Sequence, residues 1–416
     1  MAESNTLDVL KQSFEKIIPA QDGRTRMTPL SFVVCLVYCY LGDSKTFSLE
    51  AIRRFTMKQT GITISRSAFW ERLTTKRLRE FLIGVVAELM SELNASFGLG
   101  KGLSTRLGVS AIYLFDSSSI TLNDGAGKCF PGTRTSAGIK WHLGLDVLSG
   151  LMIWYRLTPT RTHDRKCFPE IDGLVGKLVI FDLGYWDYGL LLALEKAEVF
   201  FLSRVKSNAV IMIKKVVQGL AKQYAGQALF SVPLNRKRGK IIEVLAEKIY
   251  KGQTLSCRVV GFWNPYEGCY HWYMTNLTAA AHIMYPLYRL RWQIELVFKA
   301  CKNSLNANRI PSAEKPIIEN LLLASLAAHP SSYTIFSNGL EHLDDEQKLA
   351  VSFQRVAMVA AVLAQDFVTF LLSSSRKHYF KLLEQIKFFS GELFDPNYKH
   401  RETTMMRLNR MLAEGA

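Results

Sequence analysis

The sequence predicts a mixed α/β core between two helical regions. Between residues 109 and 205, apolar runs of strand length follow one another and are interrupted by helical segments, which is the pattern of a sheet with helices on its faces. Residues 1–100 and 316–416 instead repeat their apolar side chains at helical spacing. With 416 residues, 48% of them hydrophobic, the chain is long enough for several domains and a substantial core.

The N-terminal region contains two expected helices joined by a short turn. The first, residues 48–61, has Ser48 as its N-cap and Gly61 as its stop. The second, residues 65–82, carries a row of basic side chains. Helix, turn and helix form a shape that binds DNA; an ordinary helical hairpin with a solvated basic face is an equally good interpretation. The residues assigned to DNA binding here are Arg66, Arg72 and Lys76.

The core is predicted from a succession of apolar runs and turns. A turn at Ser149-Gly150 joins two strands into a hairpin. The expected order is three strands, helix, strand, helix and strand, at residues 109–122, 138–150, 151–159, 167–175, 178–187, 187–198 and 199–205.

Residues 206–270 break this rhythm, because they are basic and rich in strands near their end, as expected of an insertion. Their basic cluster Arg236, Lys237 and Arg238 either contacts DNA phosphate or forms a solvated loop. The predicted domains are a helical domain, a candidate for DNA binding, at 1–105, the first part of the core at 106–205, the β-rich insertion at 206–270, the second part of the core at 271–335, and a helical region, a candidate for dimerisation, at 336–416.

Composition limits the partners. The formal charge of +16 and the isoelectric point near 9.5 favour a polyanion, with nucleic acid first and an anionic membrane surface second. The longest apolar runs, residues 29–41 and 356–364, are too short to span a bilayer and are expected to be core helices. No secretory signal is visible, and seven scattered cysteines without a C-x-x-C pair favour reduced core thiols.

Two aspartates follow strands of the buried type. Asp116 ends the run Ile-Tyr-Leu-Phe, and Asp182 ends the run Leu-Val-Ile-Phe. An ionised carboxylate in such a place is costly unless it is paired, and the two strands are expected to be neighbours in one sheet. Two like charges brought together call for a cation. Mg²⁺, which prefers hard oxygen ligands, meets that need.

Residues 285–302 read as one strongly amphipathic helix. At about 100° per residue, a narrow face collects an acid, several bases and a phenol beside an apolar stripe. In the simplest interpretation Glu295 pairs with its neighbours on a solvated face, where each pair contributes about 0.2–0.5 kcal/mol. The members of this polar face are Tyr288, Arg291, Glu295, Lys299 and Lys302.

A second interpretation uses the whole face. If the helix packs on the sheet, Glu295 is the third carboxylate of a two-metal site with Asp116 and Asp182. Such a site stabilises the attacking and leaving oxygens of phosphoryl transfer. The cations then bind phosphate, Arg291 as a two-pronged donor and Lys302 as a point charge.

The spacing of four of these residues is similar to that of a known family. Tyr288, Arg291, Glu295 and Lys302 leave two, three and six residues between them. This matches the Y-(2)-R-(3)-E-(6)-K signature of the IS4 family of bacterial insertion-sequence transposases. The resemblance covers roughly residues 45–335.

The surroundings of the two aspartates agree with the resemblance. Asp116 resembles the first catalytic aspartate of that family, and Asp182 resembles the second, with the usual glycine at Gly184. The long step from Asp182 to Glu295 leaves room for a β-rich insertion. One departure is Asp187, which stands where an aromatic residue is expected.

The resemblance implies an RNase H-like (retroviral-integrase-like) catalytic core with the β-rich insertion. It implies a D-D-E triad of Asp116, Asp182 and Glu295, which are both catalytic residues and ligands of Mg²⁺, for which Mn²⁺ is expected to substitute. It implies cleavage at the terminal inverted repeats and attack of the freed 3′-OH on target DNA, by a homodimer in a synaptic complex on double-stranded DNA. A cytoplasmic, nucleoid-associated bacterial protein without membrane contact is expected.

Further side chains are expected to contact DNA near the cleaved end. A flipped base needs an aromatic platform, for which Trp263, Trp272 and Trp292 are candidates, although a single tryptophan is more often part of a core. His163-Asp164 could approach the metals, although a loop histidine more often serves elsewhere. The signature residues expected to grip DNA are Tyr288, Arg291, Lys299 and Lys302, with Trp292 beside them.

Three other functions stay open at this point. A related nuclease could use the same triad to cut DNA without joining it. A DNA-binding inhibitor or a decayed relic could recognise the ends without catalysis; intact acids at all three positions argue against decay. A membrane-surface protein is disfavoured because no isolated cationic amphipathic anchor is present.

Overall fold

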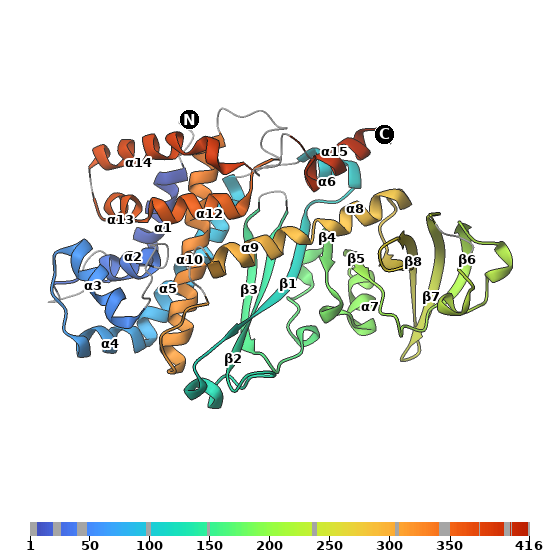
Figure 1. The fold of residues 1–416 in the computed structure, drawn as a ribbon, viewed down its shortest axis with the longest axis horizontal. Coiled ribbons are helices and arrows are strands. Elements are labelled where there is room, and N and C mark those ends of the chain that lie inside the picture. Colours follow the sequence, from blue (N-terminus) through green and yellow to red (C-terminus); the bar gives the residue numbers. More distant parts are fainter. Residues whose placement is uncertain are drawn as a thin grey trace.

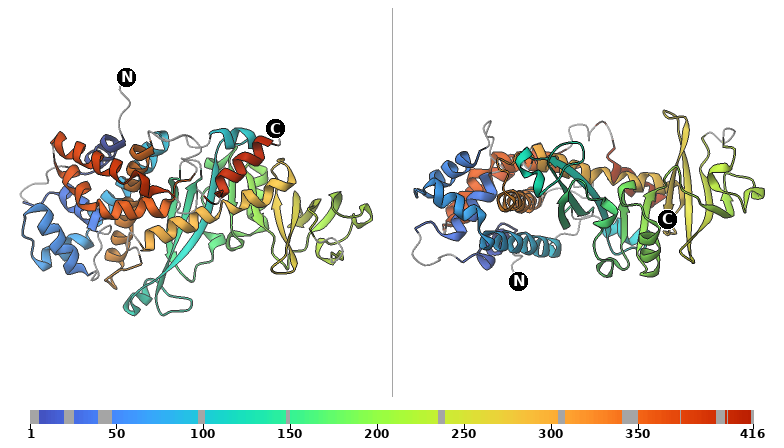
Figure 2. Two further views of the ribbon diagram at one scale, coloured as in Figure 1. Left: turned by 45° about the horizontal axis from the view of Figure 1, so that its top comes forward. Right: turned by 90° about the horizontal axis from the view of Figure 1, so that it is seen from below.

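A long sheet extends from a cluster of helices in this protein (Figure 1). The computed structural model describes residues 6–19, 26–39, 48–96, 101–147, 150–234, 239–303, 308–340, 350–373, 375–394, 400 and 402–414. Most of the N-terminal helices and most of the C-terminal ones gather at one end, and strands of the sheet form the other end, in all three views of Figures 1 and 2.

The N-terminal region is helical, as predicted. The helix α2 is buried along its length and begins at Pro29, whose fixed φ suits a first helical position. The helix α3 has the expected caps, since the Ser48 side chain accepts from Ala51 N and Gly61 adopts the left-handed conformation at φ 68°. The helices are α1 (Thr6–Ile17), α2 (Pro29–Cys39), α3 (Leu49–Thr60), α4 (Arg66–Thr74), α5 (Lys76–Ser96) and α6 (Lys101–Leu107).

The single helix expected at 65–82 is wrong. The chain leaves the helical conformation at Thr75, which has ψ 139°, and α4 and α5 are separate helices. The Thr75 hydroxyl accepts a hydrogen bond from Leu78 N at 3.2 Å, so Thr75 caps the start of α5. A β-branched residue that can cap a helix competes with continued helix at this point.

The sheet has nine described strands in the order β3-β2-β1-β4-β5-β9-β8-β7-β6. Strand β1 pairs antiparallel with β2 and parallel with β4, and β4 pairs parallel with β5. The hairpin of β2 and β3 is confirmed. The strands are β1 (Ile112–Thr121), β2 (Gly138–Asp146), β3 (Met152–Pro159), β4 (Leu178–Phe181), β5 (Phe200–Arg204), β6 (Met212–Gln218), β7 (Ile242–Tyr250), β8 (Gln253–Asn264) and β9 (Cys269–Thr275).

Residues 206–270 are strand-rich, as predicted, and their strands continue the same sheet. Strand β9 pairs antiparallel with β5, and β8, β7 and β6 follow outward from β9. Figure 1 shows these strands at the end of the sheet away from the cluster of N-terminal and C-terminal helices.

The helix expected at 167–175 is wrong. The described structure between β3 and β4 is irregular, with short 3-10 turns at Asp164–Lys166 and Asp172–Leu174. Pro169 and two glycines, Gly173 and Gly176, fall in or next to this segment, and Gly176 has φ 71°. These residues leave too short a run for a stable helix. The next expected helix is confirmed as α7 (Tyr188–Lys196).

The two faces of the sheet bury different clusters. Along β1, Ile112 and Leu114 join the cluster on the side of the helices α8 (Met284–Arg289) and α9 (Trp292–Asn303), and Phe115 joins the cluster on the side of α7. This period of two directs the even-numbered side chains of β1 toward α9.

The single helix expected at 285–302 is also wrong, because α8 and α9 are separated at Leu290 and Arg291. Leu290 N donates to Leu287 O at 3.1 Å, and Arg291 N donates to Tyr288 O at 3.0 Å. Bonds over three residues tighten the chain into a 3-10-type turn. The turn places Tyr288 in α8 and Glu295 in α9.

The C-terminal helices pack against the N-terminal ones. Helix α10 contacts α5, and α13 contacts α2; Tyr38 and Phe367 stack with ring centroids 5.4 Å apart. Both regions therefore share one hydrophobic cluster. The remaining helices are α10 (Lys315–Leu340), α12 (Phe353–Val362), α13 (Ala364–Leu372), α14 (Arg376–Phe388) and α15 (Thr404–Glu414).

No single helix among the described residues is long and apolar enough to cross a membrane; one pair, Gln354–Val362 and Ala364–Leu372, reaches the required length and composition only when its two helices, bent by 63°, are taken together.

Candidate active site

The two predicted aspartates lie side by side. The parallel pairing of β1 and β4 ends with Phe115 opposite Phe181, so Asp116 and Asp182 are the next residues on two neighbouring strands. Neighbouring strands are about 4.8 Å apart. Both aspartates stand at even-numbered positions, like the residues of β1 and β4 whose side chains face α9. The expectation that the two strands are neighbours is confirmed.

Glu295 joins this pair through an arginine. One guanidinium nitrogen of Arg291 lies 2.6 Å from Asp116 Oδ2, and the other lies 2.5 Å from Glu295 Oε1. The pairing of Glu295 with Arg291 within its own helix region was expected, whereas the bridge to Asp116 was not. Through these two ion pairs Arg291 links Glu295 on α9 to Asp116 on β1. The polar face of residues 285–302 is therefore packed against the sheet and is not simply a solvated surface.

Burial governs the charge state of this group. Burial raises the pKa of Asp116 to about 6; Arg291 opposes the rise, and the negative charges of Asp182 and Glu295 add to it. The pKa of Arg291 is raised: burial alone would lower it, but the neighbouring acids outweigh that effect, with Asp116 first. Three carboxylates therefore share one cationic side chain, an excess of negative charge that suits a further cation.

The donor set fits a divalent ion. Three carboxylates offer only hard oxygen ligands, which Mg²⁺ and Mn²⁺ prefer. In addition, Nε of Arg291 is buried and has no hydrogen-bond partner among the described residues. A buried donor without a partner is costly, so Arg291 keeps one unused donor for an acceptor such as a phosphate oxygen.

Tyr288 lies on the inner side of the same group. Its hydroxyl is 3.5 Å from Asp182 Oδ1, at the limit of a hydrogen bond, and its ring packs against Tyr273 with centroids 5.0 Å apart. Burial raises the pKa of Tyr288, so the phenol stays protonated. The phenol thus lies against the acids and within the fold.

Lys302 anchors the far end of α9 to β1. Its ammonium donates to Ser118 Oγ at 2.6 Å and to Ser119 O at 2.7 Å. Burial lowers the pKa of Lys302. Ser118 is a site residue that sequence analysis missed; the run of three serines after Asp116 was visible, but nothing in the sequence connected it with a lysine on another element.

Of the predicted aromatic platforms, Trp292 is the most exposed. Its side chain is 58% exposed at the start of α9, and Lys299 is exposed on the same helix. Trp272 is wrong as a platform, because it is buried in the sheet on the α7 side. Trp263 is half-buried against Tyr270.

A second polar network lies behind the aspartates. Nδ1 of His142 is 2.9 Å from the Tyr185 hydroxyl, and Nε2 is 2.9 Å from Thr158 Oγ1. Burial lowers the pKa of His142 to about 4, so it is neutral. Sequence analysis missed this network, since a buried histidine on β2 carries no spacing signal.

Asp164 supports the loop after Asp182. It pairs with Lys140 at 2.7 Å, and a Cβ at Gly184 would lie 2.6 Å from its Oδ2. A side chain at position 184 would therefore force the Asp164 carboxylate to shift away from its present position. The neighbouring His163 is exposed. Asp187 accepts hydrogen bonds from Gly189 N and Leu190 N and so caps α7, which gives the departure from the family pattern a structural role.

The N-terminal basic residues differ in their surroundings. Arg66 and Lys76 have side chains that are 80% and 89% exposed. Arg72 instead donates to Met27 O at 3.1 Å and stacks on Phe32. Arg236, Lys237 and Arg238 lie outside the described residues.

The comparison with protein families identifies the core. A family model described as "Transposase DDE domain" matches residues 108–329, just over half of the chain. The chain belongs to the transposase DDE domain family. The matched residues of this DDE-domain chain contain β1, β4 and α9, and the resemblance to IS4-type insertion-sequence transposases is confirmed.

Curated relatives of this DDE-domain chain are bacterial transposases. It is 24% identical over 235 residues to the transposase for insertion sequence element IS231E of Bacillus thuringiensis subsp. finitimus. This alignment covers 46% of this chain and 49% of the relative. It is 23% identical over 311 residues to the IS231B transposase of subsp. berliner, with 64% of each covered. It is 25% identical over 318 residues to the IS1151 transposase of Clostridium perfringens, with 62% and 65% covered. The chain thus spans about half to under two thirds of these relatives.

Proposed function

We propose that this chain binds the terminal inverted repeats of an insertion sequence, cleaves the DNA at these ends and joins the freed 3′-OH to target DNA. Asp116, Asp182 and Glu295 are the catalytic residues in this proposal. The observation that carries it is the meeting of three carboxylates from β1, the end of β4 and α9 on one face of the sheet, with Arg291 between two of them.

In this proposal the three carboxylates hold divalent cations, Mg²⁺ with Mn²⁺ as a substitute. When bound, these ions stabilise the charge on the attacking and leaving oxygens of phosphoryl transfer. Asp116 and Asp182 supply ligands from rigid strands, and Glu295 supplies one from α9. The excess negative charge of the group supports this assignment.

Arg291 and Lys302 orient the DNA backbone in this proposal. A guanidinium binds a phosphate through two parallel hydrogen bonds. Arg291 already lies at the acids and has one unpaired Nε, so it can hold the scissile phosphate beside them. Lys302 and Lys299 lie further along α9, and Trp292 offers an exposed ring for stacking at its start.

The fold supports an RNase H-like core. Strand β1 lies centrally, with the antiparallel hairpin of β2 and β3 on one side and the parallel strands β4 and β5 on the other. In this assignment 106–205 and 271–335 form the core, 206–270 is the β-rich insertion, and 1–105 binds DNA ends. The region 336–416 is proposed to dimerise in a synaptic complex; its exposed apolar side chains include Met358, Val362, Phe380 and Phe388.

The test is cleavage and joining of a labelled duplex that carries the element's terminal repeats. Wild type, Glu295→Gln and the matched surface control Glu198→Gln, at an exposed side chain between α7 and β5, are compared with Mg²⁺ and with EDTA. Nicks at the repeat end and joined products, both lost with EDTA and in Glu295→Gln only, support the proposal. Nicks without joining identify a nuclease. Binding without cutting in any protein, as for an inhibitor, overturns the catalytic assignment.

A further inference from the structure

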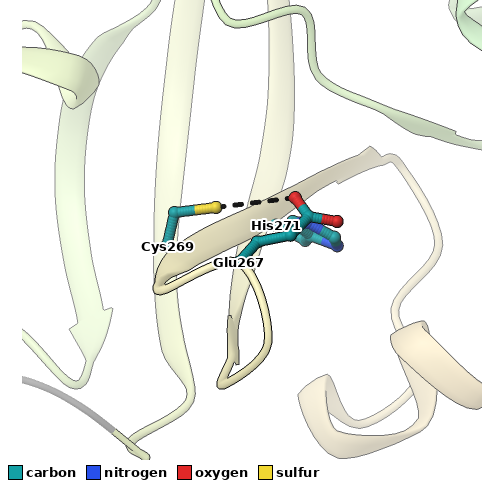
Figure 3. A group of neighbouring side chains, drawn as sticks. All are labelled: Glu267, Cys269 and His271. Atoms are coloured by element: carbon teal, nitrogen blue, oxygen red, sulfur yellow. Dashed lines mark hydrogen bonds and ion pairs between the residues drawn. The ribbon is translucent and has the colours of Figure 1, made fainter.

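A second group of metal-binding side chains lies away from the three carboxylates. Strands β8 and β9 form a hairpin whose strands pair up to Asn264 and Cys269. Figure 3 shows Glu267, Cys269 and His271 gathered at the end of this hairpin. Glu267 and Cys269 are exposed and His271 is half-buried.

The turn that carries Glu267 is held in one conformation. Gly268 N donates to Asn264 O at 2.9 Å, and Tyr266 N donates to the Asn264 side-chain oxygen at 3.0 Å. Gly268 adopts φ 65°, which favours glycine. These bonds bring Glu267 back over the first residues of β9.

The three ligand atoms converge. Cys269 and His271 are two residues apart on one strand and therefore face the same side of the sheet. Glu267 Oε2 lies 2.8 Å from His271 Nε2 and 3.8 Å from Cys269 Sγ, and all three ligand atoms lie within 4.8 Å of one another. In tetrahedral Zn²⁺ sites the bond lengths give edges of about 3.4 Å for nitrogen to oxygen and about 3.6 Å for sulfur to oxygen. The observed nitrogen-to-oxygen separation is shorter than its edge by about 0.6 Å, and the sulfur-to-oxygen separation is longer than its edge by about 0.2 Å.

The types of the three side chains indicate which metal ion they would bind. One thiolate, one imidazole and one carboxylate suit a borderline divalent ion such as Zn²⁺, whereas Mg²⁺ prefers oxygen ligands alone. We propose that Glu267, Cys269 and His271 form a Zn²⁺ site with a fourth position open to solvent. The ion ties the turn to the start of β9 (Cys269–Thr275).

The site lies on the face of the sheet that α8 covers. Cys269 and His271 have the same parity as Tyr273, which packs against Tyr288. An ion here adds positive charge on the α8 side of the sheet. The open fourth position can accept water or a phosphate oxygen.

The test uses Co²⁺ as a spectroscopic probe for Zn²⁺ on the metal-free, full-length chain. Wild type should develop a thiolate-to-cobalt charge-transfer band that saturates at one equivalent. Zn²⁺ should abolish the band and excess Mg²⁺ should not. Cys269→Ser should remove it, His271→Gln should weaken binding at least about tenfold, and the matched control Cys129→Ser, at another exposed cysteine, should leave it unchanged.

The outcome is independent of catalysis. Glu295→Gln should keep the band, so loss of DNA cleavage and loss of this site are distinguishable. A wild-type chain without a charge-transfer band, or a band that survives in Cys269→Ser, overturns the proposal and leaves Glu267 and His271 as an ordinary surface ion pair.

Discussion

Arg291 holds the acidic side chains of the candidate active site together, because it forms ion pairs with both Asp116 and Glu295. Its side chain is 18% exposed, so its charge is only partly screened by water. Sequence spacing predicted the pair with Glu295 but not the bridge to Asp116, since the bridge depends on how α9 packs on β1.

Arg291→Ala should therefore destabilise the chain without divalent ions by roughly 1–3 kcal/mol, as expected when a charged hydrogen-bond partner is removed. Mg²⁺ should recover part of that loss, because the ion supplies the missing positive charge. Urea unfolding with and without Mg²⁺ measures both effects, with Arg291→Lys as the variant that keeps the charge. An equal loss in both conditions would contradict a shared cation site.

His142 gives a pH dependence with a definite sign. Its folded-state pKa of about 4 lies below the ordinary value of 6.5, so the folded chain favours the neutral ring. The stability from this residue is complete above pH 6.5 and is lost as the pH falls toward 4. The expected loss is about 2 kcal/mol at pH 5 relative to pH 8. In His142→Gln, the unfolding free energy measured by urea titration should fall between pH 8 and pH 5 by that much less than in wild type. An equal fall in the two proteins would contradict the assignment.

At the scale of elements, the sequence predicted strands better than helix ends. The strands that carry Asp116 and Asp182 are continuous apolar runs, and runs of that kind leave few alternatives. The helices at 65–82 and 285–302 were expected to be unbroken, because their apolar periodicity continues through the breaks. A cap at Thr75 and a 3-10-type turn at Leu290 interrupt them, and such local hydrogen bonds are not visible in periodicity.

The break between α4 and α5 can be tested directly. Thr75→Ala removes the oxygen that accepts from Leu78 N, and should cost about 1 kcal/mol of unfolding free energy. Thr74→Ala is the matched control, because Thr74 Oγ1 only bonds back to Glu71 O within α4. Thermal or urea unfolding of the two variants measures the difference. Equal stability of the two variants would argue against Thr75 as the cap.

At the scale of the molecule, the sequence predicted an α/β core between helical regions, and this is confirmed. It did not predict that the two helical regions share one hydrophobic cluster, or that the strands of 206–270 extend the same sheet. Both depend on contacts between segments far apart in the chain, for which one sequence carries no signal.

The basic charge of the whole molecule predicts DNA binding whose affinity depends on salt concentration. If α3–α5 bind DNA ends, Arg66→Gln and Lys76→Gln should each reduce the slope of log affinity against log salt by about 0.9, the value for one lost phosphate contact. Arg72→Gln should instead lower stability and leave the slope, because Arg72 is bound to Met27 O and Phe32. Fluorescence anisotropy at several salt concentrations measures the slopes. A reduced slope for Arg72→Gln together with unchanged slopes for Arg66→Gln and Lys76→Gln would contradict this assignment of the interface.

The central claim is that Asp116, Asp182 and Glu295 bind divalent ions together, and iron-directed backbone cleavage tests it most directly. Fe²⁺ takes the place of Mg²⁺ on the full-length chain, ascorbate generates hydroxyl radicals at the bound ion, and mass spectrometry locates the broken peptide bonds. Breaks are expected near all three acids, and they should be suppressed by excess Mg²⁺ and lost in Glu295→Gln. Breaks that are absent from these three places, or that persist unchanged in Glu295→Gln, would contradict it.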